Sequence, residues 1–174
     1  MRVESMFRMV RCEGIGMAIV TRSLTLNAAF LQEIKEDNRQ LRELLGKTKS
    51  IFTDLGKAFP AQKSVVDLLW RLRDQLAMHF ALEDAYGYFD DAIAEAPRLS
   101  EQAVILRRQH DDLFLQICEL VEQAEQVLYG ENTLGDRAAL ASSYLSFHKA
   151  FQEHETREDE LILEAFDDDI GVGD

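Results

Sequence analysis

Two copies of a histidine–glutamate pair are the residues of this chain whose types and spacing are best suited to chemistry. Residues 79–84 read His-Phe-Ala-Leu-Glu-Asp, and residues 154–159 read His-Glu-Thr-Arg-Glu-Asp. Residues four apart in a helix lie one above the other on one face, so each histidine and its glutamate can point at a common spot. Imidazole and carboxylate groups at this spacing are typical of metal ligands.

Both pairs lie on apolar stripes in which residues recur in alternating steps of four and three. The stripe that leads to His79 and Glu83 consists of Val65, Leu69, Leu72 and Leu76, and the stripe that leads to His154 and Glu158 consists of Leu140, Tyr144, Phe147 and Phe151. These stripes predict that the two pairs face the core. Because an unpaired buried carboxylate is costly, a bound metal ion is an economical explanation of the pattern.

The periodic segments predict four long helices over about residues 23–56, 62–94, 100–129 and 136–166. Both prolines, Pro60 and Pro97, fall between these segments. Four amphipathic helices with short connections favour an all-α, antiparallel up-down-up-down four-helix bundle. We expect the bundle to span residues 23–169, between an N-terminal tail of residues 1–22 and a C-terminal tail of residues 170–174.

A third histidine, His110, replaces an apolar residue in the stripe of the third predicted helix. Helices rise by a constant distance per residue, so the distance of each residue from the connecting loops gives its height in an antiparallel bundle. This count places His79, Glu83, His110, His154 and position 38 of the first helix at one height. The sequence therefore predicts a polar layer that crosses the bundle.

Composition excludes several other classes of protein. The net charge of −13 argues against binding to nucleic acids or anionic membrane surfaces, because both need basic patches. No apolar run is long enough for a transmembrane helix, and the first residues lack the apolar segment of a signal peptide. The two cysteines indicate no disulfide framework, so we expect a cytoplasmic protein.

From about residue 25 to 166 the chain resembles the hemerythrin-like, or HHE cation-binding, family. Four stretches carry the resemblance: residues 36–45 in the first helix, the two His-x-x-x-Glu-Asp stretches, and Arg-Gln-His-Asp-Asp-Leu at residues 108–113. The resemblance implies a di-iron centre in a four-helix bundle, with one histidine from each helix and two bridging glutamates. Oxygen-carrying members have a further histidine one turn from His110, where this chain has Phe114 and Leu106.

The resemblance implies the metal ligands His79, Glu83, His110, His154 and Glu158. Asn38 occupies the place of the first-helix histidine, and its amide oxygen can offer only a weak ligand or a hydrogen bond to a ligand. Three outcomes stay open: a di-iron site with an open position, a mononuclear site, or a site that has lost metal. Iron suits this donor set first, followed by manganese or zinc.

We expect a non-haem iron protein that binds or senses a small molecule such as oxygen, nitric oxide or peroxide. The alternative is a metal-free bundle that acts as a regulatory or protein-interaction module. Turnover cannot be separated from reversible binding on these residues, so enzymatic activity is left open. The fourth histidine, His148, lies one position off its stripe and is predicted to lie at the surface or on a flank.

Overall fold

Five α-helices and one short 3-10 helix occur in the computed structural model, which describes residues 28–53, 62–85, 87–130 and 134–167. The long helices are α1 (Ala28–Thr53), α2 (Gln62–Ala85), α4 (Ser100–Tyr129) and α5 (Leu134–Asp167). Between α2 and α4 lie α3 (Tyr88–Glu95) and the 3-10 helix η1 (Pro97–Leu99). The described residues contain no strand, which confirms the predicted all-α class.

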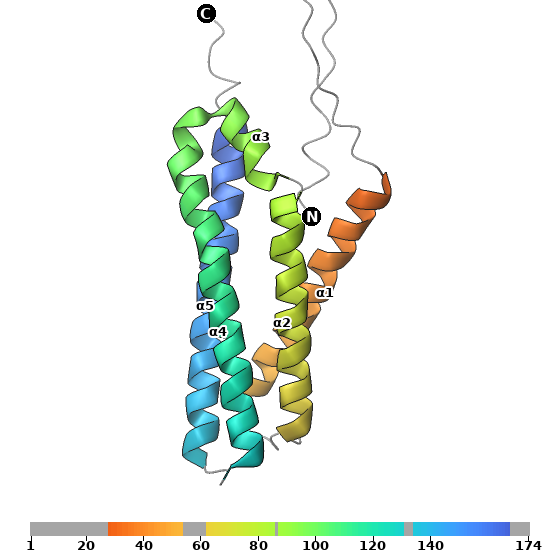
Figure 1. The fold of residues 1–174 in the computed structure, drawn as a ribbon, viewed down its shortest axis with the longest axis vertical. Helices are drawn as coiled ribbons and strands as arrows, with labels where there is room; N and C mark the ends of the chain where they lie inside the picture. The colour runs from red at the N-terminus through yellow and green to blue at the C-terminus, as the bar shows by residue number, and fades with distance from the viewer. Residues whose placement is uncertain (1–27, 54–61, 86, 131–133, 168–174) are drawn as a thin grey trace, which may run out of the picture.

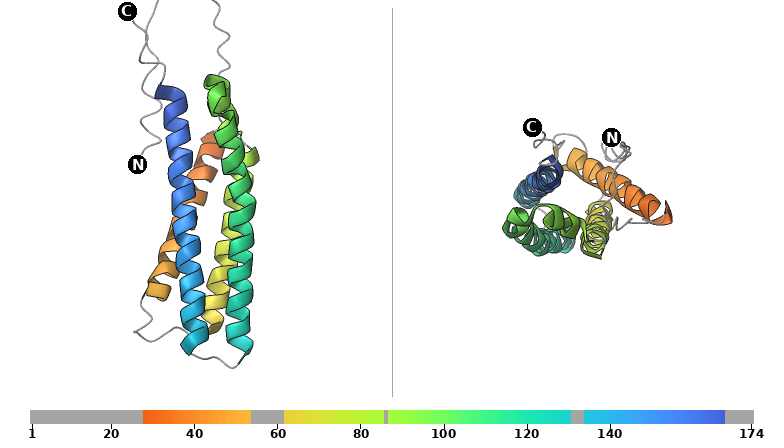
Figure 2. Two further views of the ribbon diagram at one scale, coloured as in Figure 1. Left: turned by 90° about the vertical axis from the view of Figure 1, so that its left-hand side faces the viewer. Right: turned by 90° about the horizontal axis from the view of Figure 1, so that it is seen from above.

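The four long helices form an antiparallel bundle (Figure 1). Helix α1 packs against α2 and α5, and α4 packs against the same two helices, so the four close a ring that is seen end-on in Figure 2. Toward its N-terminal end α1 leans away from the other helices (Figure 1). The predicted four-helix bundle is confirmed.

Each long helix buries one stripe and exposes the other side. In α4 the buried side chains recur every three or four residues, as expected for an amphipathic helix. They are Ala103, Leu106, His110, Leu113, Ile117, Leu120, Val121, Ala124 and Val127. One histidine thus takes a place that an apolar residue fills elsewhere in the stripe.

A polar layer separates two apolar cores. The larger core joins side chains of α1, α2, α4 and α5, and the smaller one joins α3 and η1 to α4 and α5. Along α4, Leu106 belongs to the smaller core and Leu113 to the larger one, with His110 between them. On α5 the same order is Leu161, then Glu158 and His154, then Phe151. We call His79, His110, His154 and Glu158, with Glu83, the polar layer.

The predicted second helix is interrupted, so the expectation of one helix over residues 62–94 is wrong. Gly87 has a φ angle of 64°, a left-handed conformation that ends α2 and that glycine adopts without steric cost. A Cβ atom at this position would also lie 3.1 Å from an oxygen of Asp90. The backbone N–H of Asp90 donates to the Gly87 carbonyl at 2.8 Å, which starts α3 in a new direction.

Both tails expected from the sequence, and the predicted start of the first helix at Ser23 or Thr25, lie outside the described residues. In the part of the chain that the structure describes, no helix combines the length and the apolar character that a membrane span requires.

Candidate metal centre

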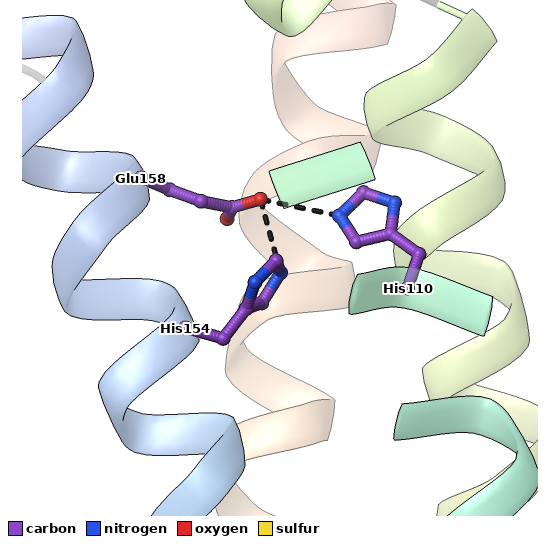
Figure 3. A group of neighbouring side chains, drawn as sticks. All are labelled: His110, His154 and Glu158. Carbon is purple, nitrogen blue, oxygen red and sulfur yellow. Dashed lines mark hydrogen bonds and ion pairs between the residues drawn. The ribbon is translucent and has the colours of Figure 1, made fainter. Parts of the chain in front are cut away.

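Three buried side chains form the first half of the candidate centre: His110 from α4, and His154 and Glu158 from α5. One carboxylate oxygen of Glu158, Oε1, lies 3.2 Å from His110 Nε2 and 3.0 Å from His154 Nε2. Figure 3 shows this oxygen between the two imidazole rings. We call these three residues the His110 group.

The second half consists of His79 and Glu83 from α2 with Glu155 from α5, which we call the His79 group. His79 Nε2 lies 3.2 Å from Glu83 Oε1 and 3.1 Å from Glu155 Oε1. The other ring nitrogen, Nδ1, lies 3.1 Å from Oδ2 of Asp37 on α1. The Gln75 side-chain amide donates to the other oxygen of Asp37. Asp37 thus fixes the orientation of the His79 ring.

Glu83 faces both halves of the centre. Its Oε1 points at His79, and its Oε2 lies 3.5 Å from His110 Nε2. Only 13% of this side chain is exposed. A single carboxylate with one oxygen toward each group has the arrangement that a bridging ligand needs.

Phe80 packs among the three histidine rings of the layer. Its ring stacks on His110, with centroids 4.2 Å apart and planes inclined by 9°. It meets the His154 ring edge-on, with centroids 5.9 Å apart, and the His79 ring at a tilt, with centroids 5.8 Å apart. Since the rings are held by a rigid aromatic neighbour, the imidazole nitrogens are oriented before any cation arrives.

The electrostatics of the layer are dominated by burial and by carboxylate–imidazole contacts. Burial opposes a charge on His79, but hydrogen bonds with Asp37 and Glu155 and the charge of Glu83 raise the pKa of His79 to about 10. Burial raises the pKa of Glu83 to about 9. Burial acts in the same direction on Glu158, but contacts with His110 and His154 hold its pKa below the ordinary value. Glu158, which has two imidazoles beside it, thus keeps its charge more readily than Glu83, whose pKa is also raised by the neighbouring carboxylates Glu158 and Glu155.

The donors of the layer fit a divalent transition-metal ion. Ligand atoms at about 2.1 Å from such an ion lie about 3 Å apart when they occupy adjacent coordination positions. The nitrogen–oxygen distances of 3.0–3.2 Å in both groups have this size. Glu83 Oε2 is also buried without a hydrogen-bond partner among the described residues. Buried atoms of this kind are satisfied when they share a cation.

A comparison with known protein families shows which of them this chain belongs to. The model of the hemerythrin HHE cation binding domain matches residues 29–166, which is most of the chain. The chain belongs to the hemerythrin HHE cation-binding domain family. Comparisons with curated proteins and with solved structures give no significant match.

The structure of this HHE domain brings together the five residues that the sequence predicts as ligands. They are His79, Glu83, His110, His154 and Glu158. The single height predicted for them is therefore found in the fold. Asn38 does not take part: it is half-buried, and no hydrogen bond or ion pair among the described residues joins its side chain to the layer. Asp37, one position earlier and only 6% exposed, faces the layer instead.

Two residues of the candidate centre, Asp37 and Glu155, are not predicted by the sequence patterns. A signal for Asp37 was present, because Asp37, Leu41, Leu44 and Thr48 form a second stripe with steps of four and three, and all four are buried. Glu155 follows His154 by one position, as Phe80 follows His79. Glu155 contacts His79 and Phe80 contacts His110, in each case a histidine of another helix. Only the assembled bundle shows these contacts.

His148 lies on a buried flank of its stripe, the second of the two positions predicted for it, and not at the surface. Its side chain is 7% exposed and stacks on Tyr144, with ring centroids 6.0 Å apart. Neither ring nitrogen has a hydrogen-bond partner among the described residues. The helix turns by about 100° per residue, so a residue one position off the stripe can still be buried where a neighbouring helix is close. Burial and the nearby charge of Lys49 lower the pKa of His148.

We expect acid to destabilise the HHE domain in part through His148. Its folded pKa lies below the value of 6.5 expected for the unfolded chain, so the unfolded state binds the proton more tightly. The stabilising contribution is complete above pH 6.5 and is lost as the pH falls through the folded pKa. A His148→Phe variant should therefore gain stability relative to the wild type as the pH is lowered from 7.5 to 5.

Urea unfolding of both proteins across this pH range measures the effect. The difference between the two proteins cancels the titration of the histidines in the polar layer, because both proteins contain them. A difference in the free energy of unfolding that does not change with pH would contradict the role assigned to His148.

Proposed function

We propose that this HHE domain is a cytoplasmic, non-haem iron protein that holds two ferrous ions in the polar layer and binds or senses a small molecule there. The observation that carries the proposal is the pair of three-donor groups joined by Glu83. Two histidines and one carboxylate, as in the His110 group, are a common ligand set of non-haem Fe(II) sites with open positions. Oxygen, nitric oxide and peroxide are ligands that such positions accept.

Access to the layer supports the proposal. An open groove of about 550 Å³ runs between α1 and α2, and Asp37, Gln75 and Met78 are among its lining residues. Asp37 contacts His79 on its inner side, so the groove ends one residue from the His79 group. The groove thus brings solvent to the side chain that contacts His79, and displacement of Asp37 would open the layer to a diatomic molecule or peroxide.

Ferrous iron is expected to stabilise the folded chain, because it binds only where the layer is assembled. At a free Fe²⁺ concentration about 100 times the Kd, the gain is about 2.7 kcal/mol, which raises the Tm by about 5–10 °C. Anaerobic thermal unfolding with and without Fe²⁺, together with the iron content per chain, measures this.

Two variants make the measurement specific. A His110→Ala, His154→Ala double variant should show a reduced thermal shift, because one of the two groups is destroyed, whereas His148→Phe should retain the full shift because His148 lies outside the layer. Absence of bound iron and of any shift in the wild-type protein would refute the proposal.

The second candidate is a metal-free bundle that works as a regulatory or interaction module. The contacts of His79 favour it, because Asp37 and Glu155 can balance a charged imidazole without a cation. In that case Fe²⁺ leaves the Tm unchanged, and the His79→Gln variant is less stable than the wild type in the absence of any metal. The iron titration therefore separates the two candidates.

A further inference from the structure

The two halves of the centre differ in their donors. The His110 group offers two imidazoles and one carboxylate, whereas the His79 group offers one imidazole and two carboxylates. Imidazole-rich sites suit iron and zinc, and carboxylate-rich sites suit harder ions such as manganese. The two groups therefore differ in charge and in donor type, and Mn²⁺ is a suitable probe of the carboxylate-rich one.

Glu155 makes the difference. Its Oε1 lies 3.1 Å from His79 Nε2, as close as Glu83 Oε1, which belongs to the same helix as His79. Glu155 comes from α5, so it reaches His79 across the bundle. Without it, the His79 group would contain only the histidine and the glutamate of α2.

Asp37 strengthens the carboxylate character of this half. Its contact with His79 Nδ1 leaves Nε2 as the nitrogen that faces Glu83 and Glu155. A carboxylate behind a ligand histidine orients the ring and increases its basicity. The residue of α1 that contacts His79 is therefore the acid Asp37, and no hydrogen bond or ion pair among the described residues joins Asn38 to this histidine.

We propose that Glu155 is a ligand of the second cation, which the His79 group would hold through one imidazole and two carboxylates. This inference rests on the proposed function, since it assigns a further ligand to the same centre. Glu155 is 42% exposed, so its replacement removes a donor without opening a cavity in the core.

The test compares Glu155→Gln with the wild type and with Glu153→Gln, a matched control on the exposed side of the same helix. Equilibrium dialysis against Mn²⁺ alone, followed by metal analysis and by electron paramagnetic resonance of the bound Mn²⁺, gives the affinity and the number of sites. A parallel anaerobic dialysis against Fe²⁺ gives the number of ferrous ions that stay bound per chain.

We expect Glu155→Gln to weaken Mn²⁺ binding at least 10–100-fold, the loss typical of weaker perturbations around metal ligands. At least one Fe²⁺ should remain per chain, and Glu153→Gln should match the wild type in both measurements. Unchanged Mn²⁺ binding in Glu155→Gln, or an equal loss of Mn²⁺ and all Fe²⁺, overturns the inference while iron binding by the wild type still stands. A wild-type chain that binds neither ion overturns the proposed function as well.

Discussion

Replacement of Glu158 by glutamine is expected to abolish Fe²⁺ binding at the His110 group and to destabilise the metal-free chain. Glu158 is 3% exposed, and its Oε1 is the only oxygen shared by His110 and His154 among the contacts of the described residues. Removal of one partner from a buried charged cluster costs about 3–5 kcal/mol. The affinity for Fe²⁺ at this group should fall by more than 100-fold, since loss of a group behind a ligand already costs 10–100-fold.

Glu160→Gln is the matched control for this prediction. Glu160 lies two positions away on α5 and is exposed, so the substitution changes the same charge without touching the layer. Iron content and urea unfolding of both variants measure the two effects. Wild-type iron content in Glu158→Gln would remove Glu158 from the centre.

The second large effect is expected from Phe80→Ala. Phe80 is 5% exposed and contacts the rings of all three layer histidines. Truncation of a buried phenylalanine costs about 3–5 kcal/mol because a cavity is left behind. The imidazoles also lose the neighbour that orients them, so Fe²⁺ affinity should fall together with stability.

Phe147→Ala separates the two consequences. Phe147 is equally buried in the larger core, and its aromatic contacts are with Tyr144 and Phe151 rather than with the layer. Both variants should lose similar stability in urea unfolding, but only Phe80→Ala should lose Fe²⁺ affinity. An equal loss of affinity in the two variants would show that Phe80 acts through stability alone.

The sequence predicted the layer because two kinds of regularity agree in it. Steps of four and three place His79, Glu83, His154 and Glu158 on buried stripes, and the constant helical rise places them with His110 at one height. Both regularities are local properties of helices, so they can be read before the bundle is known. The fold confirms the predicted bundle and brings these five side chains into contact.

The residues that were missed depend on how the helices are rotated about their axes. Two adjacent stripes on α1 fit the apolar pattern equally well, one through Asn38 and one through Asp37, and only packing against α2 selects Asp37. Glu155 was missed for a related reason, because its partner His79 lies on another helix. The break at Gly87 depends on the left-handed conformation of this one residue, which the apolar pattern does not indicate because it continues past the break.

Unequal burial of the two groups has a kinetic consequence. All three residues of the His110 group are buried, whereas Glu155 of the His79 group is in part exposed to solvent. Under the proposed two-cation arrangement, a chelator added outside the bundle removes the ion beside Glu155 first, and the ion beside Glu158 leaves last. Exchange of the ions therefore proceeds in a fixed order through a singly loaded form, and the accessible half sets how quickly that form is reached.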